Sequence, residues 1–174
     1  MFTEERIGEI LNQLKVLTRP WEIPLTGWQY RHCGGETKPS PQDPDCGWEP
    51  FPGGHVWGGH CQHFAFHTTI AVPETCQGKP LDFTLRTGQE GAWDATNPQF
   101  TVYVDGVLRQ GFDVNHGCLR LSDCAEAGRT YRIYLSAYTG VQNFHLLFDA
   151  RLRTVDLVVE QLLRAFCGEY FASS

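Results

Sequence analysis

The feature that most constrains the fold is a two-residue hydrophobic period through the middle of the chain. Between His60 and Leu152, apolar residues alternate with polar ones in short runs, which is typical of half-buried strands. The alternating apolar positions are Phe64, Phe66, Ile70 and Val72, then Leu81, Phe83 and Leu85, then Phe100, Val102 and Val104, then Tyr131, Ile133 and Leu135, and finally Phe144, Leu146, Phe148, Ala150 and Leu152. The pattern predicts a mainly β protein.

Turn residues separate these runs. Asp105-Gly106, between Val104 and Val107, predicts a two-residue hairpin, because a type I′ turn needs positive φ at both central positions. Short strands with such close turns favour an antiparallel sandwich or jelly roll over a parallel sheet.

The two ends of the chain follow a different period. Residues 2–18 and the residues after Thr154 carry apolar side chains at helical spacing, which predicts a helix at each end. Residues 32–54 are rich in Gly, Pro and Asp and predict a long connection, with a short strand near Trp48. The expected organisation is an N-terminal helix over 1–20, a β-sandwich over 21–153 and a C-terminal helix over 154–174. We expect the apolar stripe of the last helix to pack against the sandwich or another copy of the chain. That stripe comprises Leu157, Val158, Leu162 and Phe166.

Composition narrows the classes of partner. The 174 residues carry a net charge of −6 with no cluster of Lys or Arg, which argues against nucleic acid and anionic membranes as partners. No apolar run approaches the roughly 20 residues of a membrane span, and the acidic N-terminus does not resemble a signal peptide. The seven cysteines are odd in number and form no CxxC, which favours reduced thiols in a cytoplasm; a Cys33–Cys46 disulfide is the minor alternative.

A metal site is the first alternative for the histidines of "GGHCQHFAFHTT". On a strand, His63 and His67 share a face, but four residues separate them by roughly 13 Å, too far for one ion. With His60 they are therefore expected to be solvent-facing side chains opposite Phe64 and Phe66.

The sequence signals for other kinds of catalytic site are equally weak. The sequence has no G-x-S-x-G elbow and no phosphate-binding glycine loop, while Cys61 and Cys118 lie in strand-like runs where a thiol usually packs. Glu90, Asp94 and Asp113 have the residue type for paired-carboxylate glycoside hydrolysis. In β-loops, however, such side chains more often cap turns by bonding nearby backbone.

Several segments together resemble one enzyme family. They are "TEERIGEILNQL", "GWQYR", "WEPFPGGHVWGGHCQHFAFHTTIAVPE", "TGQEGAWDATNPQFTVYVDGVLRQGFDVNH", "AYTG" and "TVDLVVEQLL". Over nearly the whole chain, the sequence resembles the N-terminal region of glycoside hydrolase family 38 alpha-mannosidases of the cytosolic and bacterial branch. The resemblance implies a non-catalytic, galactose-binding-like jelly-roll β-sandwich with a helix at each end, set before a catalytic domain that performs zinc-dependent retaining hydrolysis of alpha-mannosides.

No catalytic residue and no metal ligand can be carried over to this chain. The zinc signature of the family has a Gly-His-x-His-x-Asp character, and neither Gly54-His55 nor Gly59-His60 is followed by that spacing. The resemblance therefore implies no cofactor here, and zinc only in the catalytic domain of the parent enzyme.

The segment "RQGFDVNH" is then interpreted as an edge that docks on the catalytic domain of the same chain. We expect Gly111 to bend the chain away from the sheet. The candidate interdomain or sugar-proximal residues are Trp93, Asp94, Asn97, Asp113, Asn115 and His116.

Two other functions remain open from the sequence. One is a free-standing carbohydrate-binding module, and the other is an assembly domain that forms a homo-oligomer. A continuation into a catalytic domain would distinguish the accessory domain from the module.

Overall fold

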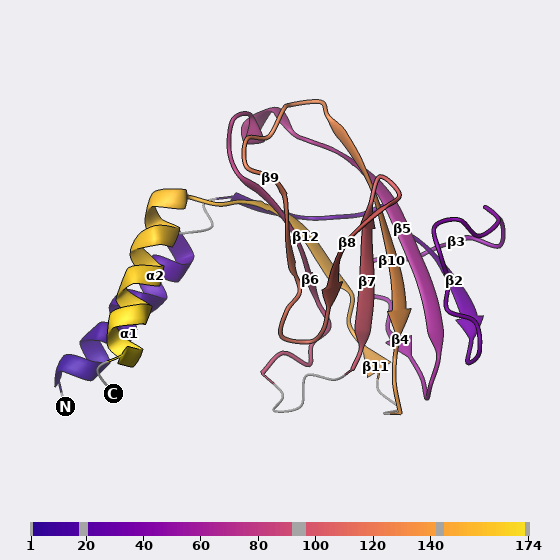
Figure 1. The fold of residues 1–174 in the computed structure, drawn as a ribbon, viewed down its shortest axis with the longest axis horizontal. Helices are drawn as coiled ribbons and strands as arrows, with labels where there is room; N and C mark the ends of the chain where they lie inside the picture. Colours follow the sequence, from indigo (N-terminus) through magenta and orange to yellow (C-terminus); the bar gives the residue numbers. More distant parts are fainter. Residues whose placement is uncertain (1, 18–20, 92–96, 142–144, 173–174) are drawn as a thin grey trace.

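The computed structural model describes residues 2–17, 21–91, 97–141 and 145–172. Over these residues the chain is mainly β, as the alternation predicts: two antiparallel sheets form a sandwich, with a helix at each end (Figure 1). The helices and the 3₁₀ turn are α1 (Phe2–Leu17), η1 (Glu74–Cys76) and α2 (Leu157–Ala172). The strands are β1 (Trp21–Pro24), β2 (Gln29–Gly34), β3 (Glu49–Pro50), β4 (Trp57–Gly58), β5 (His63–Ala71), β6 (Leu81–Arg86), β7 (Gln99–Val104), β8 (Val107–Phe112), β9 (Cys118–Ser122), β10 (Thr130–Tyr138), β11 (His145–Leu146) and β12 (Asp149–Thr154).

The described strands form two main layers. One sheet has the order β1-β12-β6-β9 and lies on the side of the helices; the other has the order β3-β2-β5-β10-β7-β8 (Figure 1). Strands β4 and β11 pair with each other at one end of the sandwich.

The predicted inward residues build the core between the layers. Phe66, Phe83 and Leu135 are fully buried. Aromatic rings join the two layers, since the rings of Phe83 in β6 and Phe112 in β8 stack with centroids 5.9 Å apart. The rings of Phe148 and Trp57 pack on Phe66 of β5, with centroids 4.5 Å and 5.1 Å away. Such rings bury large apolar areas, which stabilises the sandwich.

The predicted two-residue turn forms in the hairpin between β7 and β8. Asp105 and Gly106 have φ values of 53° and 79°, as a type I′ turn requires. Strand β8 differs from the expectation, because Gly111 does not bend the chain away. It pairs with Thr101, and the strand continues to Phe112 opposite Phe100.

The predicted run from Phe144 to Leu152 is not one strand over its described residues, 145–152; Phe144 lies outside them. Strand β11 pairs with β4, whereas β12 belongs to the four-stranded sheet. The chain thus passes from one pairing partner to another at Leu147 and Phe148. A period of two is preserved across such a transfer, so alternation alone did not reveal it.

The terminal helices form a pair of their own. Helices α1 and α2 lie side by side and antiparallel beside the sandwich, and both chain ends lie at the far end of the pair (Figure 1). The stripe of α2 was expected to pack against the sandwich or another copy of the chain. It does not pack against the sandwich, since Leu157, Val158 and Leu162 are 42%, 76% and 45% exposed, and packing against another copy stays a prediction. The side chain of Phe166 lies outside the described ones. No helix in the described part of the chain is long and apolar enough to cross a membrane.

Candidate functional site

The segment after β8 is ordered by the carboxylate of Asp113. Its Oδ1 accepts hydrogen bonds of 2.8 Å from the backbone N–H groups of Asn115 and His116. The ring of His116 adds a third donor, with Nδ1 2.9 Å from both carboxylate oxygens. These contacts form a turn in which an acidic side chain caps its own backbone, as expected for Asp residues in β-loops.

The same contacts change the acidity of Asp113. Burial raises the pKa of its carboxyl, but the hydrogen bonds from the His116 ring and from the Asn115 and His116 backbone lower it more, so the net pKa lies below its ordinary value. Asp113 is thus a carboxylate at neutral pH, already engaged by three donors. It is better suited to hold a loop than to accept a proton in catalysis.

A second loop is tied to this turn. Oδ1 of Asn115 accepts a 2.8 Å hydrogen bond from the backbone of Gly91. Just before it, the Glu90 carboxylate accepts hydrogen bonds from the backbone of Thr87 and Gly88. The carboxylates of Glu90 and Asp113 therefore both cap turns. Nothing in these contacts supports the hypothesis that they act as a catalytic pair.

Asn97 lies at the same end of the sandwich. It precedes β7, whose first pairs with β8 place Phe100 opposite Phe112, one residue before Asp113. The side chain of Asn97 packs against Gly140, where a Cβ would overlap it. Trp93 and Asp94, the other two candidates, lie outside the described residues, so docking through this edge stays a prediction.

A cavity of about 530 Å³ borders Asp113. It lies against β5, β7, β8 and β10 on the outer face of the six-stranded sheet. Polar and aromatic side chains from several segments line it, namely Lys38, His63, Gln99, Thr101, Ser136 and Tyr138. Apart from His63, the sequence analysis did not single out these residues. The alternation of apolar and polar residues predicts that most of them lie on the outer face of the sheet, but only the pairing register of the strands brings them together.

The histidines near β5 are more enclosed than expected. His63 and His67 do lie on the face opposite Phe64 and Phe66, yet both are half-buried. The Trp48 ring packs edge-on over His67 at 4.2 Å, and the Tyr138 ring lies 4.7 Å from that of His63. Burial lowers the pKa of His67, and the positive charge of Arg132 lowers it further.

The cysteines and possible metal ligands give no reactive centre. The described thiols, including Cys33 and Cys46, are free. Cys118 does lie in a strand but is exposed, and Cys61 lies in a turn at φ 51° rather than in a strand. Within the described ranges, no three His, Cys, Asp or Glu side chains are close enough to hold a metal ion. The resemblance places zinc in the catalytic domain of the parent enzyme, and no step of the proposed function passes through a metal in this chain.

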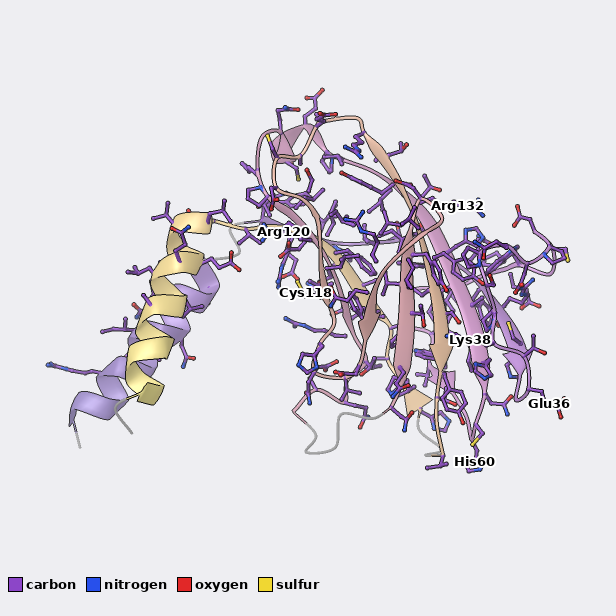
Figure 2. The ribbon with its side chains drawn as sticks, in the orientation of Figure 1. Glu36, Lys38, His60, Cys118, Arg120 and Arg132 are labelled. Carbon is purple, nitrogen blue, oxygen red and sulfur yellow. The ribbon has the colours of Figure 1, made fainter. Side chains whose placement is uncertain are left out.

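The four-stranded sheet carries an ion-pair cluster that sequence reasoning did not predict. Asp82 points outward from β6 but is only 3% exposed. Its carboxylate accepts hydrogen bonds from Arg120 at 2.5 Å and Arg153 at 3.3 Å. Arg120 also lies 3.9 Å from Glu160 of α2, and Figure 2 shows it on the side of the sandwich that faces the helix pair. The cluster therefore supports the position of the helix pair beside this sheet.

Fold and site together define a β-sandwich domain with a polar cavity on one face and an exposed helix pair beside the other. No family model and no curated protein matches the sequence. Among solved structures, the chain is similar to the β-glucuronidase of Ruminococcus gnavus in complex with D-glucuronic acid, with a TM-score of 0.47 and 11% identity, covering 78% of this chain and 29% of that one. For the complex of that enzyme with uronic deoxynojirimycin the TM-score is 0.48 with 12% identity, covering 77% and 29%. The chain thus spans less than a third of the enzyme, and the likeness concerns the fold alone.

Proposed function

We propose that this chain is the non-catalytic N-terminal β-sandwich domain of a cytoplasmic, zinc-dependent retaining alpha-mannosidase, and that it docks on the catalytic domain of the same chain. Zinc and the catalytic nucleophile belong to that catalytic domain. The family resemblance of the sequence segments supports the identity of the parent enzyme, and the exposed surface of the helix pair supports docking.

The single observation that carries docking is the apolar surface of α1 and α2. In addition to the α2 side chains described above, Ile10, Val16 and Leu17 of α1 are 50%, 74% and 60% exposed. Six large apolar side chains on one helix pair are unusual for a surface that faces water permanently. Covering each of them would contribute up to about 1.5–3 kcal/mol. A catalytic domain that follows α2 is positioned to supply that cover.

The first test concerns catalysis. The 174-residue chain is incubated with an aryl alpha-mannoside, with and without added zinc, and release of the aryl group is measured. The proposal expects no hydrolysis under either condition. Hydrolysis that is abolished by a point substitution within this chain would show that the domain is itself catalytic.

The second test concerns docking in the intact enzyme. Val158→Ser and Leu162→Ser replace exposed apolar side chains of α2, and Gln161→Ala changes an exposed polar residue of the same helix as a matched control. The two serine variants are expected to lower the midpoint of the first thermal transition or the mannosidase activity, while the control leaves both unchanged. Equal behaviour of all three variants contradicts docking through the helix pair.

A parallel pair of variants tests the predicted edge. Asp113→Ala and His116→Ala are compared in the intact enzyme and in the 174-residue chain. Docking through this edge predicts weaker activity or domain association in the former and little loss of stability in the latter. The opposite pattern would make the segment a structural turn only.

A further inference from the structure

The outer face of the six-stranded sheet is hollowed along a row of short side chains. Gly111, Thr101 and Ser136 lie directly opposite one another across β8, β7 and β10. Ala65 of β5 continues the row opposite Ser136. Because the side chains of Thr101 and Ser136 are short and Gly111 has none, these three residues of the row form the floor of the 530 Å³ cavity. We call this feature the outer groove.

An aromatic wall borders the outer groove on one side. The next row of paired residues contains Gln99, Tyr138 and His63. The rings of Tyr138 and His63 lie 4.7 Å apart and are tilted by only 32°. They present adjacent, nearly parallel rings, which suit contact with the apolar face of a flat ligand.

Two opposite charges complete the lining. Lys38 comes from the long connection between β2 and β3 and lies over the lower half of the sandwich, near the end of β10 (Figure 2). Asp113 comes from the end of β8. One cation and one anion give the groove no net charge, which does not favour a phosphate or another strongly charged ligand.

The floor carries the hydroxyl of Ser136, a residue that is only 4% exposed and lines the cavity. In the aromatic wall, Nδ1 of His63 is buried with no hydrogen-bond partner among the described residues. Buried polar atoms are almost always paired in native structures, so this ring nitrogen points to a ligand or ordered water in the cavity.

We propose that the outer groove binds the pyranose ring of an uncharged saccharide. The Ser136 hydroxyl and the Gln99 amide can each donate and accept, as neighbouring sugar hydroxyls require. The Tyr138 ring contacts one face of the pyranose, while Lys38 and Asp113 bond hydroxyls at its edges. The cavity volume lies within the roughly 300–1,000 Å³ of small-molecule sites.

A peptide fits this groove less well. An extended peptide binds a sheet through unpaired backbone groups at an edge strand. The groove instead crosses the face of four strands, and β5, β10 and β7 have neighbours on both sides. Recognition must therefore come from side chains, and those present suit hydroxyl groups. The inference goes beyond the proposed docking role and does not depend on it.

The experiment titrates the 174-residue chain with methyl alpha-D-mannopyranoside, methyl alpha-D-glucopyranoside and, separately, a short alanine peptide. Binding is followed by amide chemical shifts and by calorimetry. At least one sugar is expected to give saturable shifts at millimolar concentration, centred on residues 99–101, 111–113 and 136–138. The peptide is expected to give none there.

Three variants locate the site. Ser136→Ala removes the floor hydroxyl and is expected to weaken binding about threefold to tenfold. Tyr138→Ala removes the wall, with a loss about as large or larger. Gly111→Ala raises the floor by a methyl group; the fold accommodates it, since the nearest atom to that Cβ is the Phe100 carbonyl oxygen at 3.8 Å. It too is expected to lower affinity.

Thr130→Ala is the matched control. Thr130 lies in the same strand and on the same face as Ser136, roughly 20 Å away, near Arg132 at the opposite end of β10 (Figure 2). It should bind sugar like the unchanged chain. Thermal unfolding confirms that each variant is folded. The proposal is overturned if no sugar gives saturable shifts, if the shifts lie elsewhere, if the peptide alone binds, or if folded groove variants bind as tightly as the control.

Discussion

The backbone of Gly117 lies directly against that of Leu85. The N–H of Leu85 donates a 2.9 Å hydrogen bond to the Gly117 carbonyl oxygen, and the Leu85 carbonyl occupies the space that a Cβ at residue 117 would need. This contact holds the end of the Asp113 turn against β6, just before β9 begins. Residue 117 must be glycine because there is no room for a Cβ atom.

Gly117→Ala should therefore destabilise the chain by about 1–3 kcal/mol or more, because backbone must move to accept the methyl group. Urea unfolding measures the loss. Gly53→Ala is the control, since no atom lies within 4 Å of its Cβ position, and it should change stability by no more than about 0.5 kcal/mol. Equal stability of the two variants would contradict the close approach.

Asp82 offers a test of the ion-pair cluster. Asp82→Ala leaves Arg153, whose side chain is 12% exposed, and Arg120 without their shared carboxylate. Removing one member of such a buried pair typically costs about 3–5 kcal/mol. Asp123→Ala removes an 86% exposed partner of the same Arg120, and a surface pair of this kind contributes only about 0–1 kcal/mol. Denaturant unfolding of both variants should show this difference; similar losses would mean that burial does not decide the strength of the cluster.

Much of the fold is determined by local signals. Phe64 and Phe66 are buried because alternation alone assigns their face, and Asp105-Gly106 forms its hairpin because only a few residue pairs adopt two positive φ angles. The Asp113 turn is equally local, since its donors lie two and three residues ahead. Such features need no knowledge of the rest of the chain.

The outer groove could not be predicted in this way. Ser136, Thr101 and Gly111 meet only because of the register between β10, β7 and β8, and a shift of one residue would turn each to the other face. What covers the stripe of α2 could not be predicted for a related reason. Helical spacing shows that Val158 and Leu162 share a face, but it does not say what covers that face.

His67 should make stability depend on pH. Because burial beneath Trp48 lowers its pKa in the folded state, the unfolded chain binds the proton more tightly. Above the ordinary pKa of histidine both states are neutral and the residue has no effect. As pH falls through that value toward the folded pKa, the folded state becomes less stable. His67→Gln should flatten this dependence between neutral pH and pH values near the folded pKa, as measured by urea unfolding, whereas His145→Gln, at an exposed position, should leave it unchanged. A slope that persists in His67→Gln would assign the effect to another group.

Asp113 should protect the amides of its own turn. In Asp113→Ala, the N–H groups of Asn115 and His116 lose their acceptor, so their hydrogen exchange should accelerate while that of the Val102 amide in β7 stays unchanged. Acid should act in the same direction on the unchanged chain. Since the hydrogen bonds hold the folded pKa below its ordinary value, their contribution to stability is fully present above the ordinary pKa of aspartate and is lost as pH falls through the folded pKa. Asp113→Asn separates the effect of charge from that of shape: it keeps an acceptor oxygen, so protection should be partly restored at neutral pH and should no longer vary with acid. If all three proteins exchange these amides at the same rate, the carboxylate does not order the turn.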